Sequence, residues 1–362
     1  MTWLAPARVF DGERLRSGFA LRLEGGAVAD LAPLDPRMGA APLDATVTPG
    51  FVDLQVNGGG GVLLNDDPTP AGMAAIAAAH RPLGTVALLP TLITDRPEAM
   101  DRLAAAPSLP EGAVGLHLEG PHVAPARRGT HDPRFIRPLD ERTLAAVRRL
   151  RAARVPVLVT LAPEAASPEG ITALAAAGAV VSLGHSDATY EEAVAALAAG
   201  ATAFTHLFNA MSPLGHRAPG MVGAALASRA AVGIIADGIH VHPDILPLAL
   251  RARPAPGLSF LVSDAMPTVG GPPAFRLYGR EIRVEEGRLV NAEGGLAGAH
   301  TTMAEGVARL AALGLPHEEA LRMAITVPAR LMRLPGLAAL VGRPSRDLLR
   351  LGPDLRLLGP LT

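Results

Sequence analysis

Short apolar segments recur along most of the chain, and segments with helical spacing separate them. Several of these runs are almost continuously hydrophobic, as parallel strands covered on both faces should be. Eight runs occur, at residues 51–57, 85–93, 113–120, 155–164, 180–186, 201–210, 232–240 and 258–266. The segments between them, such as 140–153 and 191–200, repeat apolar residues with helical spacing. The pattern predicts an α/β fold with a (β/α)8 barrel of the TIM type. An open doubly wound sheet is the alternative, but no glycine-rich dinucleotide motif follows any strand.

Both ends of the chain and one internal segment depart from this repeat. Residues 1–49 alternate apolar and polar positions between frequent turns, which predicts short antiparallel strands. An inserted hairpin or small sheet is expected near 273–295, and two helices are expected between 300 and 333. The tail from 334 has little pattern and could supply one or two strands that pair with the N-terminal region.

Composition narrows the possible functions. The 362-residue chain has a formal net charge of −1 and only 3% aromatic residues, so neither nucleic acid nor an anionic membrane is an expected partner. The sequence contains no cysteine and no lysine, which excludes thiolate and Schiff-base chemistry and a carboxylated-lysine metal bridge. The lack of cysteine is compatible with a cytoplasmic location. Residues 193–216 carry no charged side chain, but their proline and polar residues favour a buried strand over a membrane span.

Polar side chains follow several of the predicted strands at the point where each strand ends. Glu119 ends the third run, His185 the fifth, His206 the sixth and Asp264 the eighth. In a TIM barrel these ends meet at one face, where catalytic residues are found. Two imidazoles and one carboxylate suit a divalent metal with an open position for water, and Asp264 is the candidate general base. Each residue alone could instead be a core histidine or a helix cap.

The loops after the third and sixth strands add a second polar group. The first loop offers Arg127, Arg128 and His131, and the second offers Asn209 and Arg217. Arginine suits a phosphate or carboxylate because its guanidinium donates two parallel hydrogen bonds. The alternative is a set of solvated loop charges, which is equally favoured for the two arginines of the first loop.

Seven motifs, taken in this order, resemble the N-acetylglucosamine-6-phosphate deacetylases of the amidohydrolase superfamily. They are PGFVDLQVNGGGG, GLHLEGPHVAPARRGTHDP, GHSDATYEEA, THLFNAMSPLGHRAPG, IADGIHVHP, LVSDAM and LAGAHTTMAEGV, and they span most of the chain. The resemblance implies a metal-dependent barrel domain at 50–333 and a small β-sandwich domain formed by 1–49 with 334–362. It also implies hydrolysis of N-acetylglucosamine 6-phosphate to glucosamine 6-phosphate and acetate in amino-sugar catabolism.

The resemblance also assigns roles to individual positions. Glu119, His185 and His206 match the metal ligands of that family, and Asp264 matches its catalytic acid/base. The positions that match substrate contacts are Thr130, His131, Asn209, Ala210, Arg217, His240, Leu296, Ala297 and Gly298. Arg217 and His240 are expected to hold the phosphate, which implies a homodimer if Arg217 acts across a subunit interface. One divalent ion per subunit is expected, with zinc favoured and iron, cobalt or manganese left open.

Two features depart from common amidohydrolase patterns. Gln55 and Asn57 stand where many members have His-x-His, which predicts one strong metal site and not two. The C-terminal end lacks the usual glycine-containing closing pattern, so the details of the small domain stay open. Three alternative functions remain, namely the same reaction on N-acetylgalactosamine 6-phosphate, cyclic-amide hydrolysis, and non-catalytic binding of a sugar phosphate. Asp264 argues against the last one, because a binding protein needs no proton shuttle.

Overall fold

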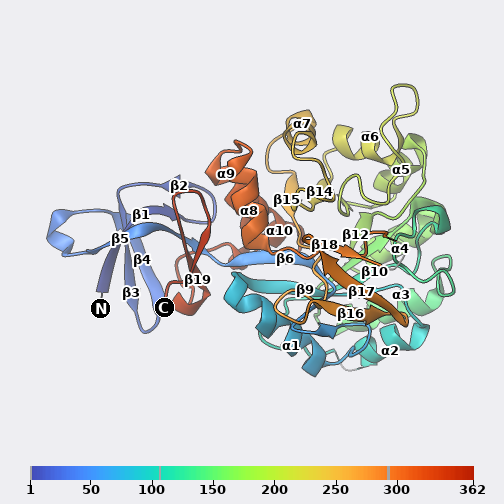
Figure 1. The fold of residues 1–362 in the computed structure, drawn as a ribbon, viewed down its shortest axis with the longest axis horizontal. Helices are drawn as coiled ribbons and strands as arrows, with labels where there is room; N and C mark the ends of the chain where they lie inside the picture. Colours follow the sequence, from blue (N-terminus) through green and yellow to red (C-terminus); the bar gives the residue numbers. More distant parts are fainter. Residues whose placement is uncertain (1, 106, 292–293) are drawn as a thin grey trace.

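The computed structural model describes residues 2–105, 107–291 and 294–362. Residues 292–293, which belong to the expected insertion, and residues 1 and 106 lie outside the described parts. The chain forms a large barrel with a smaller sheet beside it, at the left of Figure 1. Among the described residues, no helix is both long and apolar enough to cross a membrane.

The barrel contains eight parallel strands, one from each of the apolar runs in the sequence. They are β6 (Phe51–Val56), β9 (Thr85–Ile93), β10 (Leu116–Glu119), β11 (Val157–Leu161), β12 (Val180–Leu183), β13 (Ala203–Phe204), β14 (Ala231–Ile234) and β15 (Ser259–Leu261). Neighbours in the sequence are neighbours in the sheet, and residue 265 beyond β15 pairs with Val56 of β6, which joins the two ends of the sheet. The prediction of a TIM-type barrel is therefore confirmed.

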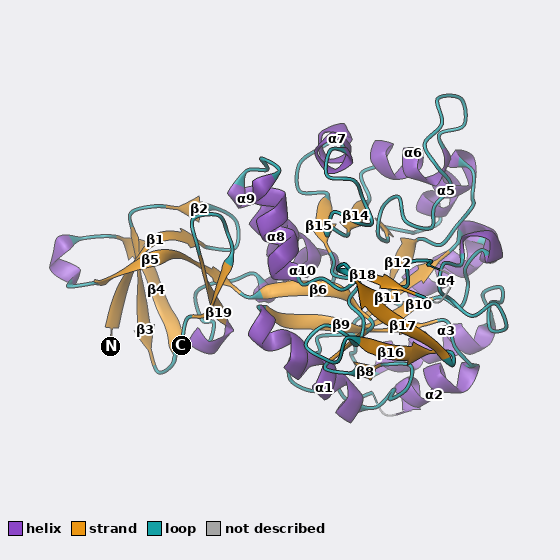
Figure 2. Cartoon of the chain, viewed as in Figure 1, coloured by secondary structure: helices purple, strands orange, loops and turns teal. Residues whose placement is uncertain are grey.

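Helices surround the strands, as Figure 2 shows in purple. They are α1 (Pro70–His80), α2 (Pro97–Ala105), α3 (Glu141–Ala152), α4 (Pro168–Ala176), α5 (Tyr190–Ala198), α6 (Gly220–Ala227), α7 (Ile245–Ala252), α8 (Met303–Ala312), α9 (His317–Leu321) and α10 (Val327–Leu331). Thr189 and Thr302 begin α5 and α8 with capping boxes, in which each threonine and the glutamate three residues later satisfy each other's free backbone N–H groups. Helices α8 to α10 occupy the two-helix region expected at 300–333, and a π-helical turn at 322–326 joins α9 to α10.

The smaller sheet combines both ends of the chain. Its strands are β1 (Thr2–Phe10), β2 (Leu15–Arg16), β3 (Phe19–Glu24), β4 (Ala27–Pro33), β5 (Ala41–Pro49), β19 (Leu348–Leu351) and β20 (Leu357–Pro360). Strand β19 pairs with β5, so the tail does supply strands to the N-terminal region. The sheet is curled, so that the backbone of Val28 in β4 forms hydrogen bonds with residues 342–343, which precede β19. Val9, Leu21 and Val47 are buried on the inner face of this curled sheet. The domain boundaries at 49 and 334 stay a prediction.

The expected insertion is a small antiparallel sheet. It comprises β16 (Ala274–Leu277), β17 (Arg280–Glu285) and β18 (Arg288–Val290). Its apolar residues Leu277, Ile282 and Leu289 pack against Ile93 and Met266 at the end of the barrel. A shorter hairpin, β7 (Gly58–Gly59) with β8 (Val62–Leu63), follows β6. Both pieces therefore lie at the strand ends where the candidate chemistry was expected (Figure 1).

Candidate active site

A cavity opens at the carboxyl ends of the barrel strands. It is lined by Asn57, Ile93, Glu119, Gly129, Thr130, His131, His185, His206, Asn209, Ala210, His240, Asp264, Met266, Leu296 and Gly298. Most of the residues singled out from the sequence are therefore brought together. Four are not: Ala297 is buried behind the lining, Arg217 is exposed on the loop that follows β13, and Arg127 and Arg128 do not line the cavity. Ile93 and Met266 line the cavity but were not identified from the sequence, because an apolar residue at a strand end carries no chemical signal.

The backbone turns sharply where the candidate residues leave their strands. His185 has φ 50°, His206 φ 30° and Asp264 φ 52°, all in the left-handed region that residues other than glycine seldom adopt. Ala210 in the same cavity has φ 51°. Such conformations cost free energy and tend to persist where function requires a side chain to be aimed. Here each turn directs its side chain across the mouth of the barrel.

Glu119, His185 and His206 converge on a single point. Nε2 of His185 lies 3.2 Å and Nε2 of His206 lies 3.0 Å from Oε1 of Glu119, and the two nitrogens are 3.0 Å apart. Burial alone would raise the pKa of Glu119, but its contacts with the two histidines outweigh burial and hold that pKa well below its ordinary value. Burial alone would lower the pKa of His206, but its contacts with Glu119 outweigh burial and raise that pKa above its ordinary value. A proton on His206 can therefore bridge the three atoms, and a divalent cation can replace that proton.

The hydrogen bonds of His185 and His131 give the two rings opposite tautomers. Nδ1 of His185 lies 3.0 Å from the carbonyl oxygen of Arg127, which can only accept, so Nδ1 carries the hydrogen and Nε2 is free to bind a metal. Nδ1 of His131 instead accepts from the backbone N–H of Thr94 at 3.4 Å, and the Thr94 hydroxyl lies 2.6 Å from it. Nε2 of the neutral His131 ring is therefore a donor.

This difference matters because His131 also lies close to the metal-ligand candidates. Glu119, His131 and His185 each offer a ligand atom within 4.8 Å of the others, and the rings of His131 and His185 have centroids 4.3 Å apart. Distance alone would thus allow His131 as a ligand in place of His206. The tautomer argues for a different use of His131, namely donation of a hydrogen bond to an oxygen in the cavity.

Asp264 is held beside the cluster by two amides. Nδ2 of Asn57 lies 2.7 Å and Nε2 of Gln55 lies 3.1 Å from Oδ1 of Asp264, and the same Gln55 amide lies 2.9 Å from Oε1 of Glu119. Burial, and then the charge of Glu119, raise the pKa of Asp264 to about 6. A carboxyl with a pKa near neutrality can both accept and return a proton, as a general acid/base must. Gln55 and Asn57 thus do more than replace the His-x-His pair: they orient the acid.

Below this layer the barrel is filled with polar groups. Asp53 is fully buried and accepts a hydrogen bond from the backbone N–H of Ser263, which links the first barrel strand to the segment after the eighth. Nε2 of His117 lies 2.7 Å from the hydroxyl of Thr160, and burial lowers the pKa of His117 to about 4. It is therefore a neutral interior residue. Asp53 was not identified from the sequence, because a buried acid in an apolar run is indistinguishable there from a surface residue.

At the other side of the cavity, His240 is fixed by an acid on its own loop. Nδ1 of His240 lies 2.6 Å from Oδ2 of Asp237, and both side chains are almost fully buried. Burial alone would raise the pKa of Asp237, but contacts with His240 outweigh it and lower that pKa. The pair fixes the orientation of the His240 ring at the cavity wall. No arginine is among the described residues that line this cavity.

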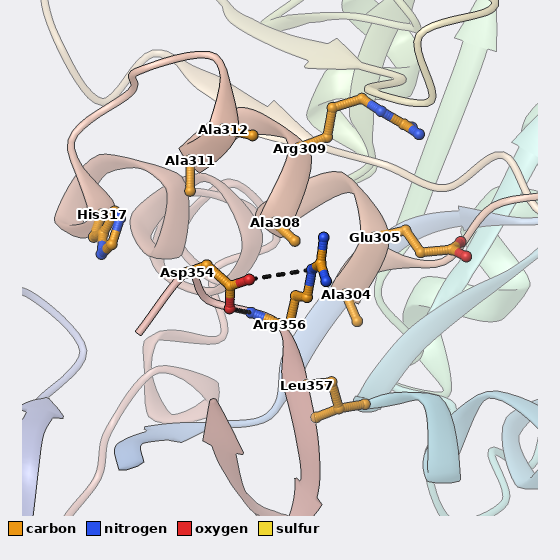
Figure 3. Close-up of a pocket in the computed structure, with 10 residues that line it drawn as sticks. All are labelled: Ala304, Glu305, Ala308, Arg309, Ala311, Ala312, His317, Asp354, Arg356 and Leu357. Carbon is orange, nitrogen blue, oxygen red and sulfur yellow. Dashed lines mark hydrogen bonds and ion pairs between the residues drawn. The ribbon is translucent and has the colours of Figure 1, made fainter. Parts of the chain in front are cut away.

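A second cleft lies away from the strand ends, between α8 and the tail of the chain (Figure 3). The wall that α8 contributes is formed largely by alanines. On the opposite wall, Asp354 and Arg356 form an ion pair with each other at 3.1 Å. None of the predicted site residues lines it. The chemistry therefore belongs to the cavity at the strand ends.

Comparisons with known proteins agree with the fold and with the chemistry expected of this cavity. The model of the amidohydrolase family matches residues 46–338. The chain belongs to the amidohydrolase family. Among curated relatives of this family member, an N-acetylgalactosamine-6-phosphate deacetylase from Shewanella sp. (strain ANA-3) is 42% identical over 86% of this chain and 81% of its own. Among solved structures, an N-acetylglucosamine-6-phosphate deacetylase from Pasteurella multocida superposes with a TM-score of 0.90 at 31% identity, covering 99% of this chain and 97% of that one. A mutant N-acetyl-D-glucosamine-6-phosphate deacetylase from Mycobacterium smegmatis, in complex with N-acetyl-D-glucosamine-6-phosphate, gives 0.86 at 33% identity and covers 98% and 96%.

Proposed function

We propose that this amidohydrolase removes the acetyl group of N-acetylglucosamine 6-phosphate and yields glucosamine 6-phosphate and acetate. The observation that carries the proposal is the placement of Asp264 beside the convergent Glu119, His185 and His206 in one cavity. The named relatives and the solved complex with the same sugar phosphate support the substrate class.

Glu119, His185 and His206 are proposed to hold one divalent ion per chain. The donor set fits, because one carboxylate oxygen and two imidazole nitrogens face one another, and the His185 tautomer leaves its Nε2 lone pair available. A cation bound there would act as a Lewis acid that polarises an amide carbonyl and makes water more acidic. Zinc is the proposed ion, and iron, cobalt or manganese would suit the same ligands.

The remaining chemistry is assigned to residues of the chain. The Asp264 carboxylate takes a proton from the attacking water as the new C–O bond forms, and delivers it to the sugar nitrogen as the C–N bond breaks. Nε2–H of His131 is proposed to donate to the acetyl oxygen as negative charge develops on it. The reaction consumes one water molecule: its hydroxyl group becomes part of the acetate, and its hydrogen ends on the sugar nitrogen.

The phosphate is proposed to bind at His240 and at Arg217 of a neighbouring subunit. His240 lines the cavity, whereas Arg217 is exposed on the loop after β13 and does not line it. A phosphate needs cationic donors, and a homodimer would bring Arg217 to the partner's cavity. The test is to co-express Arg217→Ala with Asp264→Asn: mixed dimers regain activity if Arg217 acts across the interface, and stay inactive if it acts in its own subunit.

The galacto epimer is a second candidate substrate, because the Shewanella relative is named for it. The reaction would be the same, and the two sugars differ at one hydroxyl. Ratios of kcat/KM for the two phosphorylated sugars decide between them.

Since a charged sugar phosphate does not cross a bilayer unaided, we also propose that the reaction takes place in the cytoplasm.

Acetate release from zinc-loaded protein tests the proposal. N-acetylglucosamine 6-phosphate should release one acetate per sugar, and the same sugar without phosphate should react far more slowly. Asp264→Asn should lose turnover, while Asp44→Asn at an exposed position of the small sheet should not. Absence of acetate from both epimers, with metal bound, would overturn the proposed function.

A further inference from the structure

The tip of the inserted sheet carries a residue that its backbone does not favour. Leu277 of β16 pairs with Arg280 of β17, so Tyr278 and Gly279 form a two-residue turn, with φ 50° and 82°. Such a turn favours Asn or Gly at its first position, because both of its residues have positive φ. A bulky aromatic residue held there is a strained choice, and such strain points to a role for the side chain.

The Tyr278 side chain reaches from the insertion into the barrel end. Its hydroxyl donates to the carbonyl oxygen of Thr94, the residue that follows β9. Burial, followed by the charges of Asp95 and Asp132, raises the pKa of Tyr278, so the hydroxyl stays protonated and can only donate here. The ring packs with the cluster formed by the insertion and the barrel end.

Thr94 connects this contact to His131. Its backbone N–H and its hydroxyl both lie at Nδ1 of His131, at 3.4 and 2.6 Å, while its carbonyl accepts from Tyr278. Gly120 leaves the room for this arrangement, because an added Cβ at that position would lie 2.4 Å from the Thr94 hydroxyl oxygen. The Thr94 residue is thus held between Tyr278 on one side and the His131 ring on the other.

We propose that Tyr278 is a positioning residue: it holds Thr94, and through Thr94 the His131 ring, in the orientation that presents Nε2–H to the cavity. The proposal rests on the proposed function, because it assigns Tyr278 to the reaction through His131. Tyr278 itself does not line the cavity. The role is shared with Asn65, whose amide nitrogen lies 3.0 Å from the carbonyl oxygen of Ile93 and 2.8 Å from Asp95.

The second hairpin of the insertion supplies a matched control. Glu285 pairs with Arg288, so Glu286 and Gly287 form an equivalent two-residue turn, with φ 50° and 79°. Glu286 is exposed and lies away from the cavity lining. Replacing Glu286 by Asn relieves the same backbone strain without touching the Thr94 contact.

Three variants of the zinc-loaded protein test the role. Tyr278→Phe removes only the hydroxyl, Tyr278→Asn also relieves the turn, and Glu286→Asn relieves the turn alone. We expect kcat to fall about fivefold in both Tyr278 variants with little change in KM, the effect of one lost neutral hydrogen bond on a group that acts in the transition state. Glu286→Asn should keep wild-type kcat. Tyr190→Phe, at the first residue of α5, controls for loss of a tyrosine hydroxyl elsewhere.

A spectroscopic readout separates this proposal from the proposed function. The ¹⁵N shifts of the His131 ring, assigned by comparison with His131→Gln, should report Nδ1 as acceptor in the wild type and should change in Tyr278→Phe but not in Glu286→Asn. Unchanged His131 shifts and unchanged kcat in Tyr278→Phe would overturn the positioning role. Equal losses of kcat in Glu286→Asn and Tyr278→Asn would overturn it as well, because turn relaxation would then be the cause. If the wild type releases no acetate, the proposed function fails, and the shifts alone decide whether Tyr278 orients His131.

Discussion

Asp53 should make the stability of the protein depend on pH in a way that a single substitution removes. Asp53 is a residue of β6, and its side chain is fully buried against the segment after β15. Burial is the largest cause that raises its pKa from 3.8 to about 7. Protonated Asp53 is therefore favoured in the folded chain. Its contribution to stability is present in full below pH 3.8 and is lost progressively as the pH rises to about 7.

The size of the effect follows from these two pKa values. Relative to the unfolded chain, the shifted ionisation of Asp53 costs the folded protein about 2 kcal/mol of stability at pH 5 and about 4 kcal/mol at pH 8. Asp53→Asn keeps an oxygen that can accept the N–H groups of Gln55 and Ser263, but it cannot ionise. The free energy of unfolding of Asp53→Asn, relative to that of wild type, should therefore be larger at pH 8 than at pH 5 by about 2 to 3 kcal/mol.

Urea unfolding of wild type and Asp53→Asn at pH 5 and pH 8, both with a chelator present, measures this difference. Comparison within each pH cancels the ionisations that the two proteins share. The exposed Asp44→Asn variant should differ from wild type by the same amount at both pH values. A difference between Asp53→Asn and wild type that does not change with pH would show that Asp53 is ionised in the folded chain, and would refute the burial argument.

Three further outcomes are expected at other positions. Asp264→Asn should lower kcat by about 10² to 10⁴-fold while one metal ion per chain remains bound, and loss of the ion would show that Asp264 is a ligand instead. His206→Asn should lose the metal, whereas His131→Asn should keep it and lower kcat; metal analysis after dialysis distinguishes them, and the reverse pattern would exchange their roles. Arg154, exposed after α3 with φ 63°, should give a protein about 1 kcal/mol more stable when replaced by Gly, and an unchanged urea midpoint would contradict the cost assigned to that backbone.

The barrel could be predicted because each of its strands is marked by an apolar run, and the helices between them by spacing. The runs were less informative about where strands end. The run at 201–210 forms strand only at Ala203–Phe204, and the chain then turns at His206. Leu207 and Met211 remain buried beyond that point, so apolar character continues after the strand has stopped. Hydrophobicity reports burial, and a buried turn looks like a strand.

The candidate site could be assembled from the sequence because parallel strands place their carboxyl ends at one face. Arg217 shows the limit of that argument, since the loop after β13 carries it to the surface. The roles of Thr94 and Tyr278 could not have been identified, because they depend on a contact between residues 184 positions apart and on a backbone conformation that the sequence does not mark. Opposite tautomers of His131 and His185 likewise follow from which backbone atom each ring meets.

One cation is proposed to bind at Glu119, His185 and His206, with Asp264 beside it. Anomalous diffraction at the zinc edge from crystals of the zinc-loaded protein tests this most directly. We expect one strong peak per chain at about 2.0–2.2 Å from Glu119 Oε1 and from Nε2 of both His185 and His206, with His131 outside bonding distance. A peak bound by His131 in place of His206, or no peak among these residues, would contradict the account.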